Sequence, residues 1–185
     1  AESAEGSERL VTRHVPHLQH SQHPQHLSHL PLQQLHSEIF SCRLCAAAGY
    51  FAESSPVVIG MPADMPRMML VGQAPASAVR SKDRPFSGQA GRVLFSWLAQ
   101  AGFSEDAFRA RCYFTAITKC YPGPAKGGPG KGDRAPSSVE QRLCRPFLAR
   151  ELDLIQPELI ITVGRISMTS FLGNVDFTET IGGSY

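Results

Sequence analysis

Apolar residues in this chain form three continuous runs, which are separated by stretches with helical periodicity. A continuous apolar run bounded by turn residues is typical of a buried strand, whereas apolar residues spaced three and four apart indicate a helix. Strands that are apolar throughout and alternate with helices predict a parallel sheet covered on both faces, with ligands beyond the carboxyl ends of its strands. We expect strands at 67–71, 112–118 and 159–163. We expect helices at about 32–41, 91–101, 137–155 and 165–172.

Local signals refine the second and third of these helices. Ser137 and Glu140 form a capping-box pattern that opens the third helix, and Pro146 should bend or interrupt it. Gly102 is placed to end the second helix. The apolar stripe that should face this second helix towards the core consists of Val93, Leu94, Trp97, Leu98 and Ala101.

The N-terminal stretch differs in composition from the rest of the chain. Histidines recur at every third residue from His14 to His29, among Gln, Ser, Pro and Leu. Such a tract can bind metal. We interpret residues 1–30 instead as a disordered low-complexity tail, because they carry too little apolar surface to order themselves. Residues 31–185 then form one domain.

Composition is ordinary for a soluble globular protein, with 42% apolar and 18% charged residues among 185. No apolar run approaches the roughly 20 residues that span a bilayer, and the N-terminus lacks the apolar stretch of a secretory signal. We therefore expect a cytoplasmic monomer with no membrane partner. In that compartment cysteines are more often metal ligands than disulfides. The net charge of +2 neither proves nor opposes a nucleic-acid partner.

Four of the five cysteines have a spacing that suggests a shared metal centre. Cys42 and Cys45 form a Cys-x-x-Cys pair that can reach one centre from a single turn, and Cys120 and Cys144 would converge on it in the fold. Zinc and a four-iron cluster both accept four cysteines, and the spacing does not choose between them. Alternatively, these are scattered buried cysteines, which behave as small apolar residues. Cys112 lies inside an apolar run, and we assign it to the core.

Six short segments carry the most specific features of the chain. They are SCRLC (41–45), LVGQAPA (70–76), RPFSGQAG (84–91), TAITKC (115–120), CRPFL (144–148) and IITVGR (160–165). In this order they resemble the iron–sulfur uracil-DNA glycosylases, families four and five of that superfamily, over about residues 35–173. The resemblance implies a three-layer α/β/α sandwich with a central parallel sheet. It also implies a structural 4Fe–4S cluster, in preference to zinc, on Cys42, Cys45, Cys120 and Cys144.

The resemblance implies a monofunctional DNA-repair hydrolase that removes uracil, and other deaminated bases, from DNA and leaves an abasic site. Such an enzyme flips the deoxyuridine out of the duplex and stacks the base on an aromatic ring, for which the resemblance suggests Phe86. Gln73 would orient the water or meet the base, and Gln89 occupies a second position at which the superfamily carries a catalytic group. The remaining substrate-binding positions are Gly72, Ala74, Pro75, Ala76 and Ala116.

The chain departs from the family pattern in several places. Family four carries a carboxylate at the position of Gln73 and family five at that of Gln89. An amide cannot take a proton, so electrostatic stabilisation would replace the general base. Ala116 stands where family four has an asparagine that reads the uracil edge, which predicts looser discrimination between bases. Both families carry a downstream His-Pro-Ser loop, whereas no histidine follows His36. We therefore expect a C-terminally truncated chain, without the last strand and the catalytic histidine, whose own activity is weak or absent.

Basic residues flank the expected pocket and predict contacts to DNA phosphates. These residues are Arg80, Lys82, Arg84, Lys126 and Lys131.

Two alternatives to the enzyme remain: a non-catalytic iron–sulfur or zinc module that binds DNA, and an inactive fragment of an active glycosylase.

Overall fold

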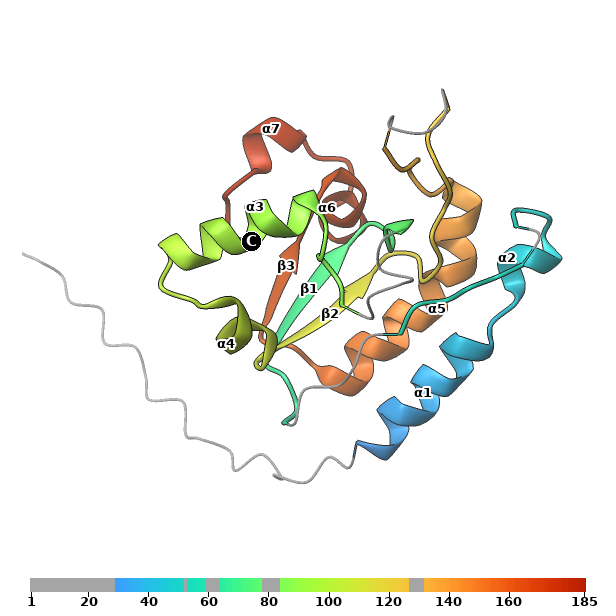
Figure 1. Cartoon of the computed structure of the whole chain (residues 1–185), viewed down its shortest axis with the longest axis horizontal. Helices are drawn as coiled ribbons and strands as arrows, with labels where there is room; N and C mark the ends of the chain where they lie inside the picture. The colour runs from blue at the N-terminus through green and yellow to red at the C-terminus, as the bar shows by residue number, and fades with distance from the viewer. Residues whose placement is uncertain (1–28, 52, 59–63, 78–83, 127–131) are drawn as a thin grey trace, which may run out of the picture.

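A three-stranded parallel sheet with helices on both faces forms the centre of the molecule (Figure 1). In this computed structural model, β1 (Met68–Gly72) lies between β2 (Cys112–Ala116) and β3 (Leu159–Thr162). All three strands lie where the apolar runs predicted them, so the expected α/β/α sandwich is confirmed. The structure describes residues 29–51, 53–58, 64–77, 84–126 and 132–185.

Helices connect and flank the strands along the chain. In the described residues they are α1 (Leu30–Ser41), α2 (Leu44–Ala47), α3 (Gln89–Gln100), α4 (Glu105–Arg109), α5 (Ser138–Ile155), α6 (Arg165–Leu172) and α7 (Phe177–Thr180). None of them is long and apolar enough to cross a membrane. The histidine-rich stretch 1–28 lies outside the described residues, so the division into tail and domain stays a prediction.

The sheet separates two apolar cores, because successive side chains of a strand point to opposite faces. Met69 and Val71 of β1 pack with α1 and α5, whereas Leu70 packs with α3 and α4. Figure 1 shows the same division, with α1 and α5 on one side of the sheet and α3 and α4 on the other. Since β1 is buried on both faces, its carboxyl end is held from two sides and offers a firm base for a site.

The face that α3 turns to the core differs from the predicted stripe. Trp97 is 65% exposed and Val93 is 42% exposed, whereas Phe95 is buried. The buried residues of this helix are Gly91 and Phe95, and Leu94 and Leu98 pack against the same core. The prediction was wrong for Val93, Trp97 and Ala101, which are exposed, because the buried face of α3 is centred on Gly91 and Phe95 and is rotated around the helix from the predicted stripe. Gly102 does end this helix, in the left-handed conformation expected of glycine there.

The start of α5 follows the prediction, but its middle does not. The Ser137 hydroxyl accepts from the Glu140 amide, and the Glu140 carboxylate accepts from the Ser137 amide, so the capping box is complete. Pro146 does not interrupt the helix, which is continuous from Ser138 to Ile155. Proline leaves the carbonyl four residues earlier, that of Arg142, without its helical partner. Both residues are exposed, so water can satisfy that carbonyl.

Candidate functional site

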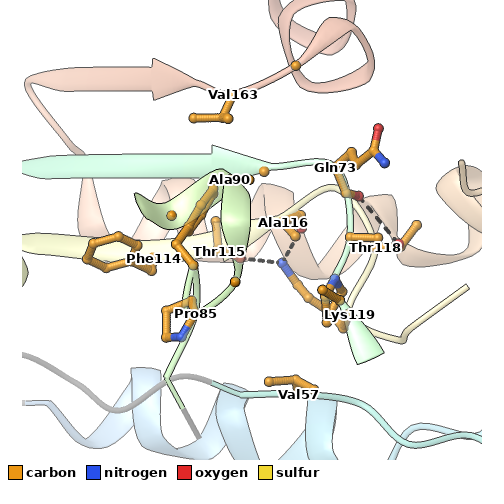
Figure 2. Close-up of a pocket in the computed structure, with 18 of the residues that line it drawn as sticks. Val57, Gln73, Pro85, Ala90, Phe114, Thr115, Ala116, Thr118, Lys119 and Val163 are labelled. Atoms are coloured by element: carbon orange, nitrogen blue, oxygen red, sulfur yellow. Dashed lines mark hydrogen bonds between the residues drawn. The ribbon is translucent and has the colours of Figure 1, made fainter. Parts of the chain in front are cut away.

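A cavity of about 410 Å³ lies beyond the carboxyl ends of β1 and β2, where parallel-sheet folds place their ligands (Figure 2). Its volume is in the range of small-molecule sites. All eight residues that the sequence analysis assigned to catalysis or substrate binding line this cavity: Gly72, Gln73, Ala74, Pro75, Ala76, Phe86, Gln89 and Ala116. The structure therefore brings these positions together, and their individual roles stay predictions.

The two strand ends that form the cavity floor are hydrogen-bonded to each other. The Ile117 amide donates to the Gly72 carbonyl at 2.9 Å, and the Thr118 amide donates to the Gln73 carbonyl at 3.2 Å. This ladder continues the pairing of β1 and β2 past their ends. These hydrogen bonds therefore fix the backbone of Gln73 at the end of the sheet. Gln89 is the first residue of α3 and is exposed at the rim of the cavity.

Phe86 lines the cavity and has an unusual backbone conformation. Its φ is 56°, in the left-handed region that bulky side chains rarely adopt. Its ring lies above Gly72, where an added Cβ would come within 3.3 Å of the ring, and its carbonyl oxygen would lie 1.6 Å from a Cβ at Gly91. Glycine is thus required at Gly91 and closely fitted at Gly72 for the ring to lie there.

A buried ion pair lies in the wall beside Ala116. The Lys119 ammonium donates to Glu151 Oε2 at 2.7 Å, to Thr115 Oγ1 at 2.6 Å and to the Ala116 carbonyl at 2.8 Å. Figure 2 shows the last two bonds. The side chains of Lys119 and Glu151 are only 4% and 3% exposed. A charge this deep is tolerated because it is paired and fully hydrogen-bonded.

The network extends from this ion pair to α1. The Tyr113 hydroxyl donates to Glu151 Oε1 at 2.9 Å, so it accepts from His36 Nε2, which lies 2.8 Å away. Burial lowers the pKa of His36, and burial together with Glu151 raises the pKa of Tyr113. His36, the last histidine of the chain, therefore supports the wall behind the cavity.

Sequence reasoning missed Glu151. The cavity lining includes two carboxylates, those of Glu151 and Asp133, although both predicted catalytic positions are amides. Asp133 accepts from the Tyr121 hydroxyl at 3.0 Å. Glu151 accepts three hydrogen bonds and forms an ion pair with Lys119, so it stiffens the wall. The available signal was the position of Glu151 on the same helical stripe as Cys144, Leu148 and Ile155, which α5 buries.

The four cysteines of the predicted centre converge beside this wall. Cys42 ends α1, Cys45 lies in α2, Cys120 follows β2, and Cys144 lies in α5. The sulfurs of Cys45, Cys120 and Cys144 each interact electrostatically with that of Cys42. Backbone amides support them, because the Lys119 amide donates to Cys144 Sγ at 3.3 Å. Cys112, by contrast, is buried in the α3–α4 core, as predicted.

The chemistry of this donor set fits a metal cluster. Burial, with a smaller contribution from the neighbouring sulfurs, raises the pKa of Cys45 to about 11 and that of Cys120 to about 12. Four adjacent thiolates therefore need a positively charged group among them. Within the described ranges, no three His, Cys, Asp or Glu side chains form a group that could hold a single ion. Four cysteine thiolates are ligands of 4Fe–4S clusters and also of structural zinc, so the donor set fits both groups.

The five residues predicted to contact DNA phosphates receive less support from the structure than the cavity residues do. Arg80, Lys82 and Lys131 lie outside the described residues, and Lys126 is exposed. Arg84 lies 3.2 Å from a Glu105 carboxylate oxygen and 3.1 Å from one of Asp106. Its charge is therefore compensated within the protein, which weakens its assignment to phosphate binding.

Comparison with known proteins identifies similar sequences. Residues 59–184 match the Uracil DNA glycosylase superfamily. A type-4 uracil-DNA glycosylase of Sulfurisphaera tokodaii is 29% identical over 74% of this chain and 56% of its own length. One of Archaeoglobus fulgidus is 32% identical over 74% of this chain and 61% of its own length. A DNA polymerase of Bacillus phage SP01 is 27% identical over 64% of this chain and 12% of its own length. The chain thus spans little more than half the length of the first two relatives.

Proposed function

The chain belongs to the uracil-DNA glycosylase superfamily, and on this basis we propose that it carries the base-binding site of a DNA-repair glycosylase. The enzyme hydrolyses the N-glycosidic bond of uracil in DNA and leaves an abasic site. The observation that carries this proposal is the convergence of all eight predicted catalytic and substrate positions on one cavity. Two similar proteins named type-4 uracil-DNA glycosylase support it.

In this proposal the cavity receives a base flipped out of the duplex. Phe86 stacks on the base from one side, since its ring lies above Gly72 at the cavity wall. The small residues from Gly72 to Ala76 let the backbone approach the sugar closely. Gln73 orients the attacking water or meets the base edge. Since Ala116 offers no side-chain hydrogen bond, other deaminated bases fit as well.

We propose that the enzyme releases the base without cutting the strand. Strand cleavage by a glycosylase requires an amine that can attack the sugar as a neutral nucleophile. Lys119 is the one lysine that lines the cavity within the described residues, and its ammonium has three hydrogen-bond partners, including Glu151. An amine held in this way is unavailable for a Schiff base.

The cysteine centre holds a 4Fe–4S cluster in this proposal, with Cys42, Cys45, Cys120 and Cys144 as its ligands. When bound, the cluster supplies positive charge and a cross-link between α1, α2, the end of β2 and α5. The backbone amide of Lys119 donates to Cys144 Sγ, while its side chain supports the cavity wall. The same residue therefore connects both sites. The unpaired state of all five cysteines supports a cytoplasmic location.

The test uses the full-length protein with single- and double-stranded oligonucleotides that contain one uracil. After incubation, alkali cleaves any abasic site, and gel electrophoresis reveals the product. We expect alkali-dependent cleavage at uracil and none in the matched thymine oligonucleotide. An intact uracil strand at stoichiometric enzyme would overturn the proposal. Residues 1–185 assayed in parallel test the expectation that this stretch alone excises little.

A non-catalytic module that binds DNA is the second candidate function. The observation that favours it is the pair of amides, Gln73 and Gln89, at the two positions where the superfamily carries a carboxylate. Under this alternative, the full-length protein binds uracil-containing or abasic DNA tightly and releases no base. Binding measured by gel shift beside the excision assay separates the two functions.

A further inference from the structure

The backbone of Phe86 needs an external restraint. Among the described residues, Phe86 and Gln156 are the two non-glycine residues with positive φ, at 56° and 47°. Gln156 ends α5, where a left-handed residue is a common helix terminator. Phe86 has no such role, and its conformation persists only if surrounding contacts over-determine it. One contact is the carbonyl that fits against Gly91.

Arg109 at the end of α4 provides the second contact. Its guanidinium Nη2 donates to the carbonyl of Pro85 at 2.9 Å, directly before the strained residue. Its Nε donates to Glu105 Oε1 at 2.9 Å, one helical turn earlier. The side chain is only 13% exposed. Its two polar contacts therefore fix the guanidinium in one orientation at the back of the loop.

Arg109 also supports the ring of Phe86 through aromatic contacts. Its guanidinium lies 4.4 Å from the ring centre of Phe95 and 5.1 Å from that of Phe114. Phe114 in turn lies 6.2 Å from Phe86, at an interplanar angle of 54°. The guanidinium thus restrains the loop twice, through the Pro85 carbonyl and through the ring behind Phe86.

We propose that Arg109 is a positioning residue for base recognition: it holds Phe86 in the left-handed conformation that aims its ring into the cavity. This inference rests on the proposed function, because it assumes that Phe86 stacks on a flipped base. Arg109 itself touches neither base nor sugar. Its effect therefore appears in the discrimination of deoxyuridine from thymidine and disappears when Phe86 is absent.

Lysine cannot replace arginine in this role. The planar guanidinium donates in two directions from a fixed fork and stacks on aromatic faces, whereas an ammonium is a compact point charge. If Arg109 contributed only charge or its ion pair with Glu105, Arg109→Lys would restore the parent behaviour. Because the geometry is what holds the Pro85 carbonyl, we expect Arg109→Lys to resemble Arg109→Met in recognition.

The experiment measures binding of the full-length protein to two oligonucleotide duplexes. One carries 2′-fluoro-deoxyuridine, which resists excision, and the other carries thymidine at the same site. We expect Arg109→Met to lower the ratio of the two affinities about tenfold, the size of a lost charged hydrogen bond, with unchanged affinity for the thymidine duplex. This ratio is independent of the folded fraction, so a general loss of stability does not mimic the effect. Arg111→Met removes an exposed arginine nearby and is the charge-matched control.

A double-mutant cycle isolates the pathway through Phe86. Phe86→Ala and Arg109→Met each lower the affinity ratio, and the double variant should be no worse than Phe86→Ala alone. Additive losses would overturn the inference, as would an unchanged ratio in Arg109→Met or full rescue by Arg109→Lys.

A structural measurement separates this inference from the proposed function. If the parent neither excises uracil nor prefers the fluorinated duplex, the proposed function has failed. A crystal structure of Arg109→Met then decides the inference alone. We expect Phe86 to leave the left-handed region and its ring to leave Gly72. A φ that stays near the parent value of 56° would overturn the role of Arg109.

Discussion

The cavity and the cysteine centre are neighbours that are held together in opposite ways. The cavity walls stabilise themselves, because Lys119 and Glu151 neutralise each other and aromatic side chains support Phe86. The four cysteines acquire mutual repulsion as they lose their protons, and burial already raises the pKa of Cys120 to about 12. The contrast teaches that the cavity is preformed by this chain, whereas the four cysteines, once deprotonated, would need the positive charge of the proposed cluster.

The largest effect should follow from breaking the cysteine centre. Cys120→Ser removes one of the four proposed ligands, and metal binding in such sites contributes directly to folding. We expect loss of iron and visible absorbance, with destabilisation of about 5 kcal/mol or more. Iron analysis and chemical denaturation measure both. A matched control is Cys112→Ala, which removes a buried cysteine outside the centre and should keep the parent iron content. Full iron in Cys120→Ser would contradict the assignment.

The next largest effect should come from the ion pair in the cavity wall. Glu151→Ala leaves the Lys119 ammonium buried without its carboxylate, which costs about 3–5 kcal/mol. Denaturant unfolding measures the loss. The double variant Lys119→Met with Glu151→Leu removes both charges and should be more stable than Glu151→Ala. If Glu151→Ala costs less than about 1 kcal/mol, the wall is not held by this pair.

A third change tests the close packing of the Phe86 loop. The Cβ of Gly91→Ala would lie 1.6 Å from the Phe86 carbonyl oxygen, which is backbone and cannot rotate away. We expect a loss of about 1–3 kcal/mol in stability and a stronger loss of binding to deoxyuridine duplexes. Gly88→Ala is the matched control in the same loop, because nothing lies within 4 Å of its Cβ. Equal behaviour of the two variants would contradict the proposed fit.

The smallest effect should be on the free energy of unfolding at acidic pH, through Glu140, which lies between Cys120 and Cys144 in the sequence. The Arg134 guanidinium, aided by Ser137, lowers the pKa of Glu140 from 4.5 to about 2. A carboxylate with a lowered pKa in the folded state stabilises the protein above its unfolded pKa and loses this contribution as the pH falls. Parent and Glu140→Gln should therefore differ by about 1–2 kcal/mol at neutral pH and converge between pH 4.5 and 2. A constant difference over this range in denaturant unfolding would contradict this.

The sequence patterns predicted the structural features that neighbouring residues determine, and they did not predict contacts between residues far apart in the chain. The capping box at Ser137 and the strand that ends at Gly72 were predictable, because neighbouring residues determine them. The ion pair between Lys119 and Glu151 joins residues that are 32 positions apart, and no local sequence pattern predicts this pairing. The exposure of Trp97 was also missed, because Trp97 lies on the predicted apolar stripe, and only the packing of α3 against the sheet brings Phe95 to the core instead.

The same division holds for the candidate site. The eight cavity positions were predictable through the family resemblance, since three of the segments that carry this resemblance contain all of them. The pairing of Arg84 with Glu105 and Asp106 was not, because a basic residue beside a pocket looks the same in sequence whether it meets phosphate or a nearby acid. The left-handed backbone of Phe86 gave no signal either, since it depends on Gly91 and Arg109 together.

The most direct test of the central claim is single-turnover release of free uracil from DNA by the full-length protein, compared with Phe86→Ala. Stacking of a base on an aromatic ring contributes about 1–3 kcal/mol. We therefore predict that the parent releases uracil in step with the formation of abasic sites and that Phe86→Ala slows release about tenfold or more. Absence of free uracil with the parent, or equal rates for the two proteins, would contradict the assignment of this cavity as the base-binding site.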